Sequence, residues 1–278
     1  MTQLILRSLG RAEVLRGGQP VKWEAESARD LVFYLMAHPE GRTREDIISA
    51  LWREDQTARS GNRFRVTLHR ARAGLGAPGC ITEAYGAYRL SDEVLRASDV
   101  FRLYAALAEA EHSEGEARFL ALGRAIAEYG GDFLPHLQAE WVLPAREEHQ
   151  AAYTRACLER SVLHCEHLHC ELAVQDLVAA LRRDPFLGEN HHQKLMTCLS
   201  VVEDKYAATE HYRRFVRFLR DDLKDAPMPE TVVLAERIKR GERLCEHGQK
   251  AAAPLLRSCP LTSDGRCPGP YAELLNLA

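Results

Sequence analysis

Residues 59–72 read RSGNRFRVTLHRAR, a stretch with five arginines, one histidine and no acidic residue. Apolar residues recur in and just after it at helical spacing: Phe64, Leu68, Ala71 and Leu75. At about 100° per residue these side chains lie within about 60° of one another and predict the buried stripe of a helix. The opposite face is basic and free of acids, whereas solvated helix faces usually mix both signs. An anionic partner is therefore expected there.

The residues before this helix predict a small sheet and two helices. The opening stretch LILRSLGRAEVLRGGQPVKW (4–23) alternates short apolar runs with glycines and a proline, which is typical of two or three short strands. Ser27 is expected to cap a first helix. Thr43 and Asp46, three residues apart, resemble a capping box and start a second helix that ends at Trp52.

The residues that follow complete a winged helix. A polar loop, 53–61, leads into the arginine-rich helix, expected from about Asn62 to Gly74, with a glycine marking its end. CITEA (80–84) and AYRL (87–90) then predict two strands joined by a tight turn. Strands, three helices and a hairpin occur in that order in winged helices.

From about Ser98 the pattern changes to long amphipathic helices. Two segments align at an offset of 34 residues, which pairs Ala173 with Ala207 and Leu181 with Phe215. This is the tetratricopeptide period, in which each helical hairpin buries its apolar face against the next. The fold class expected is mainly α, with three segments: a winged helix with a small β-sheet at 1–95, a tetratricopeptide-like domain at 97–245 and a flexible tail at 246–278.

Composition indicates a folded, soluble protein with its positive charge near the start. The hydrophobic fraction is 46% and the net charge is −3. Residues 1–95 carry a net charge of +2 and the remainder −5. The sequence contains neither the ~18 apolar residues of a membrane span nor the layout of a secretory signal, so we expect a cytoplasmic protein without membrane contact.

No enzymatic motif is present in the sequence. It lacks a GxSxG elbow, an HExxH helix and a GxGxxG turn, and the many carboxylates fall on helices where solvation explains them. We therefore expect no enzyme, no catalytic residue and no cofactor.

A group of histidines and cysteines is the other cluster with chemical potential. It comprises His164, Cys165, His167, His169 and Cys170, with His191, His192 and Cys198 on the next predicted helix. Residues three or four apart on a helix can share a zinc ion, but this spacing fits no standard zinc motif. Packing in a core is favoured over metal binding, and no metal is expected. The tail adds Cys245, His247, Cys259 and Cys267, which metal or disulfide chemistry could use; most of the eight cysteines are expected to be free thiols.

Several motifs in the right order resemble the bacterial transcriptional activator domain of SARP-type (antibiotic regulatory protein) activators. These are YGGDFLPHLQAEW (129–141), RRDPFLGENHHQKLM (182–196) and PMPET (227–231). ALW (50–52) and YGAYRL (85–90) resemble the OmpR-like winged helix of the same family. The GK[ST] phosphate loop of the larger members is absent.

The resemblance implies a bacterial transcription regulator, an activator rather than a repressor. Its third helix and wing would bind promoter DNA, and the loop 53–61 would contact RNA polymerase. Repeated half-sites imply a homodimer, at least on DNA.

Side-chain chemistry divides the candidate DNA contacts by role. Arginine can bind guanine O6 and N7 with two hydrogen bonds, and asparagine can do the same for adenine N6 and N7. Arg59, Arg72 and Arg89 are expected on phosphates, as are Arg42 and Arg44 at the start of the second helix. The full set is Arg42, Arg44, Arg59, Asn62, Arg63, Arg65, His69, Arg70, Arg72, Tyr85 and Arg89.

Two other functions stay open at this point. In the first, the repeats are a protein-interaction scaffold and the winged helix docks a partner other than DNA. In the second, the chain binds RNA. Preference for one duplex sequence over random duplex would favour DNA-directed regulation over both.

Overall fold

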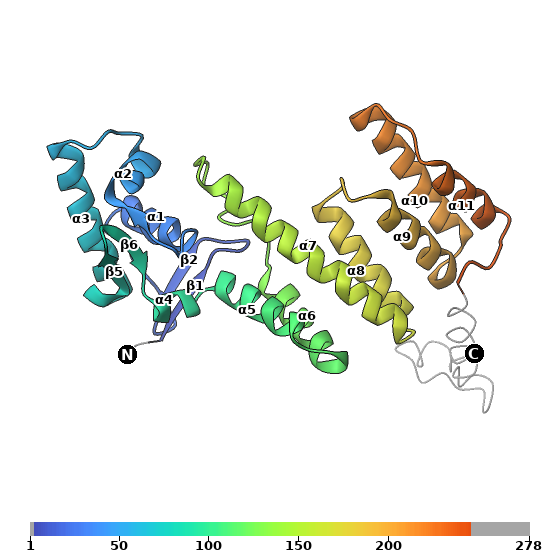
Figure 1. The fold of residues 1–278 in the computed structure, drawn as a ribbon, viewed down its shortest axis with the longest axis horizontal. Helices are drawn as coiled ribbons and strands as arrows, with labels where there is room; N and C mark the ends of the chain where they lie inside the picture. The colour runs from blue at the N-terminus through green and yellow to red at the C-terminus, as the bar shows by residue number, and fades with distance from the viewer. Residues whose placement is uncertain (1–2, 246–278) are drawn as a thin grey trace, which may run out of the picture. The chain divides into compact units, whose positions relative to one another are not determined.

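The computed structural model describes residues 3–245 and is mainly helical, with two small antiparallel sheets, which confirms the expected fold class (Figure 1). The chain divides into two compact units between Ala156 and Cys157, inside helix α7 (Val142–Glu166). No helix in the described part of the chain is long and apolar enough to cross a membrane. The expected tail, residues 246–278, lies outside the described residues, and the predicted domain boundaries stay predictions.

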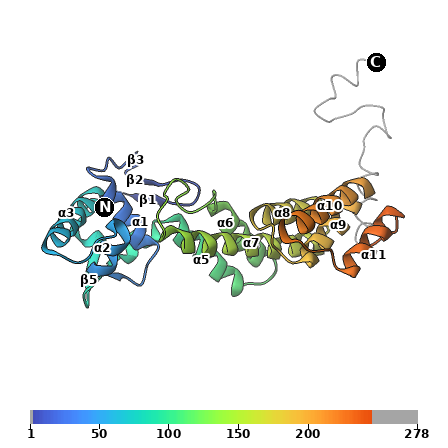
Figure 2. The same ribbon diagram turned by 90° about the horizontal axis from the view of Figure 1, so that it is seen from above.

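The first sheet contains β1 (Leu4–Arg7), β2 (Glu13–Arg16) and β3 (Gln19–Pro20), side by side in that order (Figure 2). All pairs are antiparallel, and Leu4 lies opposite Arg16. The turn between β2 and β3 consists of two glycines with φ of 61° and 79°, a conformation that glycine adopts at no steric cost. The predicted opening strands are therefore present.

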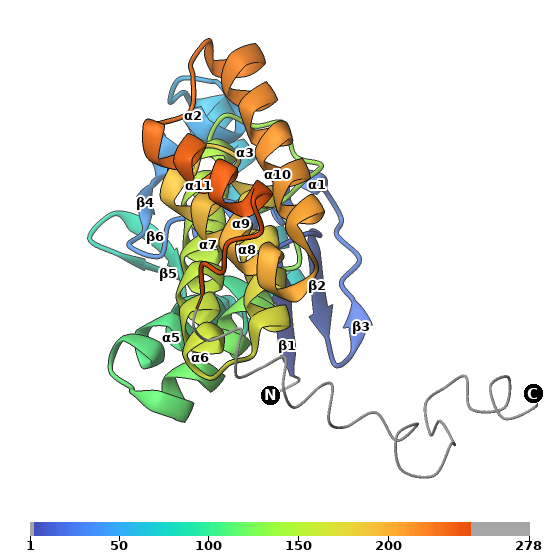
Figure 3. The same ribbon diagram turned by 90° about the vertical axis from the view of Figure 1, so that its right-hand side faces the viewer.

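Three helices and a hairpin follow: α1 (Glu26–Met36), α2 (Arg44–Trp52), α3 (Ala58–Leu75), β5 (Ile81–Ala84) and β6 (Ala87–Leu90). Strand β4 (Arg42–Thr43) pairs with β6, and the three strands lie side by side as β4-β6-β5 (Figure 3). A short 3-10 turn, Pro78–Cys80, joins α3 to β5. This arrangement is the predicted winged helix.

Helix ends differ from prediction at two places. The N-cap of α1 is Ala25, which makes no side-chain capping bond, so the expected Ser27 cap is wrong. Helix α3 begins at Ala58 rather than near Asn62, because Thr57 and Ser60 form a reciprocal capping box before the predicted start. It ends at Leu75, where Gly76 has a φ of 98° and closes the helix in the left-handed conformation that favours glycine. The predicted Thr43–Asp46 box on α2 is confirmed.

A buried carboxylate joins the first sheet to the helices that follow the wing. After α4 (Asp92–Arg96), Ser98 caps α5 (Asp99–Glu111), where the pattern change was predicted. Asp99 is 4% exposed and accepts hydrogen bonds from the Ser8 amide (2.6 Å), the Ser8 hydroxyl (2.7 Å) and the Leu9 amide (2.9 Å). The Val100 amide donates a fourth, also at 2.9 Å. One side chain therefore holds segments about 90 residues apart in sequence.

The loop after α6 (Gly115–Glu128) packs on the same segment. Gly10 donates its amide to the Asp132 carbonyl at 2.9 Å, and Leu134 donates to the Ser8 carbonyl at 2.8 Å. A Cβ at Gly10 would lie 2.6 Å from the Gly130 carbonyl oxygen, so the backbones approach too closely for a side chain. A Cβ at Gly130 would in turn lie 2.9 Å from the Leu9 carbonyl oxygen, which explains why the YGGDF motif needs its first glycine.

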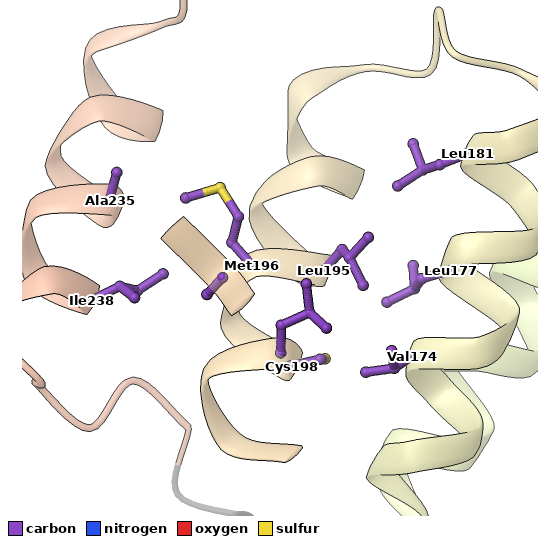
Figure 4. Packing of buried hydrophobic residues seen from close by; sticks show 10 residues of the cluster. Val174, Leu177, Leu181, Leu195, Met196, Cys198, Ala235 and Ile238 are labelled. Atoms are coloured by element: carbon purple, nitrogen blue, oxygen red, sulfur yellow. The ribbon is translucent and has the colours of Figure 1, made fainter. Parts of the chain in front are cut away.

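The second unit contains the end of α7 and two helical hairpins, α8–α9 and α10–α11. Their helices are α8 (Cys170–Arg183), α9 (Glu189–Val202), α10 (Lys205–Phe218) and α11 (Pro229–Lys239), with a π turn at Leu219–Leu223. Helix α10 begins and ends one residue later than the 34-residue offset from α8 predicts. Leu195 of α9 faces α8, where Leu177 and Leu181 lie, and Met196 points toward Ala235 and Ile238 of α11, so α9 buries apolar residues on both sides (Figure 4).

Removing the Asp99 carboxylate should destabilise the first unit strongly. Asp99→Ala leaves the buried Ser8 and Leu9 donors unpaired, at about 1 to 3 kcal/mol each. We expect the free energy of unfolding to fall by about 3 to 5 kcal/mol in urea titrations. The control is Asp222→Ala, at an exposed position, which should change it by less than about 0.5 kcal/mol. Equal effects of the two substitutions would contradict the assigned role of Asp99.

Candidate nucleic-acid interface

Helix α3 presents one buried and one exposed face, as its sequence predicts. Phe64 is 1% exposed and packs edge-on against Tyr88 of β6, with ring centroids 4.9 Å apart. Leu68, Ala71 and Leu75 are also buried. The predicted contacts on the other side are exposed, namely Arg59, Asn62, Arg63, Arg65 and His69. The predicted core stripe is thereby confirmed, and the exposed side chains are available to a partner.

Carboxylates from other elements neutralise part of this basic face. The Arg63 guanidinium lies 2.9 Å from Glu54 and 4.6 Å from the ring centroid of Trp52. Arg70 is half-buried and forms an ion pair with Glu24 at 3.1 Å. The stretch 59–72 contains no acidic residue, but Glu54 and Glu24 from other parts of the chain lie beside its arginines. No local spacing pattern links these acids to α3, so neither ion pair can be predicted from the sequence.

Arg72 has a structural role instead of the exposed position that was expected. Its Nε and Nη2 donate to the Ile81 carbonyl, at 3.2 and 2.8 Å. The guanidinium is half-buried and ties the last turns of α3 to the first residue of the wing strand β5. The expectation that Arg72 points outward to a phosphate is therefore not supported by its geometry.

Arg59 and Arg65 keep more freedom than the other α3 arginines. Arg59 has no ion pair or hydrogen bond within residues 3–245. Arg65 makes one long bond, 3.4 Å, from Nε to the Gly61 carbonyl of its own helix. Both guanidinium groups can therefore turn to a ligand without breaking an ion pair.

The wing presents an aromatic side chain at its tip. Tyr85 is fully exposed and, with Gly86, forms the turn between β5 and β6, where both residues have positive φ. Arg89, on β6, forms an ion pair with Asp92. The predicted wing residues thus lie on one hairpin, with Arg89 already partnered by an acid.

The two arginines near α2 lie in different surroundings. Arg42 belongs to β4 rather than to the helix and contacts Glu40 at 3.0 Å and the His38 ring at 2.9 Å. Arg44 opens α2 beside the Gln56 amide. In the capping box the Asp46 carboxylate accepts hydrogen bonds from the Thr43 amide and hydroxyl, and its negative charge at the N-terminus of α2 opposes a phosphate there.

The histidines and cysteines of this group differ in burial. His164, His192 and Cys198 are buried in the second unit, whereas His167 and His169 are exposed. His164 is buried 3.7 Å from Asp176, which also binds Arg160 through two bonds of 2.8 and 2.6 Å. His192 stacks on Phe215, with ring centroids 3.9 Å apart, and lies 3.2 Å from His211. Within residues 3–245, no three His, Cys, Asp or Glu side chains gather as metal ligands, and the six cysteines there are free thiols. Cys259 and Cys267 lie outside the described residues.

Comparison with known proteins identifies related sequences and folds. The family model "Bacterial transcriptional activator domain" matches residues 97–239. The fold is similar to Mycobacterium tuberculosis EmbR, solved in complex with a low affinity phosphopeptide, with a TM-score of 0.71 and 22% identity. That match covers 96% of this chain and 74% of the EmbR chain. No curated protein matches by sequence.

Loss of the Arg72 guanidinium should affect stability rather than contact with a ligand. Arg72→Ala removes both bonds to Ile81, and we expect the free energy of unfolding to fall by about 1 to 3 kcal/mol. The matched substitution Arg59→Ala, on the exposed face of the same helix, should change it by less than about 0.5 kcal/mol. Thermal and urea unfolding of both variants tests this, and the reverse order of effects would refute the assignment.

The His192–His211 pair should make the second unit sensitive to acid. Burial lowers the pKa of His192 and of His211 to about 4, from the ordinary 6.5. The unfolded chain therefore binds more protons between pH 6.5 and 4, and the free energy of unfolding falls as pH is lowered through this window. In urea titrations between pH 6.5 and 4, the free energy of unfolding of His211→Gln should fall less steeply with falling pH than that of the wild type. The exposed His167→Gln is the control and should keep the wild-type slope; a wild-type slope in His211→Gln would contradict the effect.

Proposed function

Because the chain belongs to the bacterial transcriptional activator domain family, that of the SARP-type transcription regulators, we propose that it activates transcription by binding promoter DNA through its winged helix. The observation that carries the proposal is the exposed face of α3, where Arg59, Asn62, Arg65 and His69 lie away from the buried Phe64 stripe. An α-helix fits the major groove of B-form DNA, and these side chains match the hydrogen-bonding groups of its bases and phosphates.

The free and paired arginines suggest a division of roles at the DNA. Arg65, near the middle of the exposed region of α3, is assigned to a base edge. Arg59, in the first turn of α3, is assigned to a phosphate. Arg89 on the wing is assigned to a second phosphate of the DNA backbone, for which it would leave its ion pair with Asp92. Arg63 and Arg70 would contact DNA only after leaving their ion pairs with Glu54 and Glu24. Arg42 and Arg44 lie at the edge of this surface.

Three further parts of the proposal concern partners and location. RNA polymerase would contact the segment before α3, which is shorter than the expected 53–61 because α3 begins at Ala58. The protein would act as a homodimer on repeated half-sites. It would act in the cytoplasm, with DNA contacts assigned to residues 1–95 and partner contacts to 97–245.

A second candidate, a protein-interaction scaffold, draws support from exposed apolar residues of the helical repeats. Phe186 is 69% exposed, Val233 58% and Met228 53%. Helical repeats present such surfaces to peptides and proteins. A scaffold function is compatible with DNA binding. It would become the main function of the protein only if the protein bound no DNA duplex.

Two arginine variants of the full chain test the DNA assignment. Against a duplex selected from random sequence, Arg65→Ala should lose about 1 to 3 kcal/mol of binding free energy and relax the base preference at one position. Arg59→Ala should weaken all duplexes about equally and reduce the logarithmic salt slope by about one. Mobility-shift titrations at several salt concentrations measure both.

The matched control is Arg214→Ala, on the exposed surface of α10, which should bind as the wild type does. Wild-type affinity, base preference and salt slope in both α3 variants, with folds intact by thermal melting, would overturn the assignment of α3 to DNA.

A further inference from the structure

Val66 is the large apolar side chain of α3 that faces solvent. It is 41% exposed, whereas Phe64, Leu68 and Leu75 of the same helix are buried. Among residues 3–95, Tyr85 at the wing tip is the only other large hydrophobic side chain with comparable exposure. The winged helix thus exposes its large apolar side chains on the two elements assigned to DNA.

The helical geometry places Val66 at the centre of the exposed face. At about 100° per residue, it lies roughly opposite the middle of the Phe64–Leu75 stripe. Asn62 and His69, four residues before it and three after, are exposed on the same face. A side chain opposite the buried stripe is the one that a recognition helix carries deepest into a groove.

The neighbouring arginines do not cover this position. Arg63, three residues before Val66, is held by Glu54 and Trp52, and Arg70, four residues after it, is held by Glu24. The centre of the face is therefore a branched apolar group beside the Asn62 amide. The major groove offers one apolar group on its base edges, the 5-methyl group of thymine.

Resting on the proposed function, we propose that Val66 determines specificity by packing against the 5-methyl group of a thymine in the recognised half-site. Contact between the two methyl-bearing groups removes both from water, which stabilises the complex without any charge. The adjacent Asn62 amide matches adenine N6 and N7. The recognised half-site is therefore expected to contain the contacted thymine and an adenine close to it.

Replacing thymine by deoxyuridine removes only the methyl group and keeps every hydrogen bond. The full-length protein is titrated against its selected duplex, and against duplexes in which each thymine in turn is deoxyuridine. The wild type should lose roughly fourfold in affinity at one thymine per half-site, the loss expected for one buried methyl group. Val66→Ala should bind the thymine duplex more weakly by a similar factor and show no further loss at that deoxyuridine.

The control is Val162→Ala, at a 43% exposed valine of α7, which should keep the wild-type response to deoxyuridine. Thermal melts check that both variants are folded. If wild type and Val66→Ala bind the duplex and respond equally to every deoxyuridine, the role of Val66 is overturned while DNA binding stands. If the wild type prefers no duplex at all, the proposed function fails together with this inference.

Discussion

The buried Asp99 carboxylate is the constraint on which the first unit depends. It accepts the Ser8 and Leu9 amides at the end of the first strand while it opens α5, so the sheet and the helices after the wing cannot separate without leaving buried donors unpaired. The close backbone contact of Gly10 with Gly130 adds a second connection at the same place. The winged helix and the start of the activator domain therefore form one compact unit through residue 156.

Local patterns in the sequence predicted the elements well, and long-range partners poorly. The Phe64 stripe follows from the 3.6-residue period alone, because it depends only on neighbours along the helix. The bond from Arg72 to the Ile81 carbonyl depends on where the wing packs, and no spacing reveals it. The start of α3 was missed because Ser60 and Gly61 resemble a loop, although Thr57 and Ser60 cap the helix.

The histidines of the second unit show the same limit in another form. His164 has a helical neighbour at ligand spacing, and His192 on the next predicted helix could have completed a zinc site, yet each faces a different partner, Asp176 and His211. Sequence spacing states which residues can share a helix face, but not where neighbouring helices place their own side chains. The interpretation as core packing fits the burial of both rings.

The pairing of arginines also changes how the charge of the α3 face should be interpreted. Arg63, Arg70 and Arg89 already have carboxylate partners, and Arg72 is committed to the backbone of the wing. Each paired arginine must give up a partner before it neutralises a phosphate, which reduces its net contribution to affinity. The number of arginines in 59–72 therefore overstates the charge that this face offers to an anionic partner. In the proposed complex, discrimination between DNA sequences would depend more on side chains whose contacts need no ion exchange, such as the Asn62 amide and the Val66 methyls.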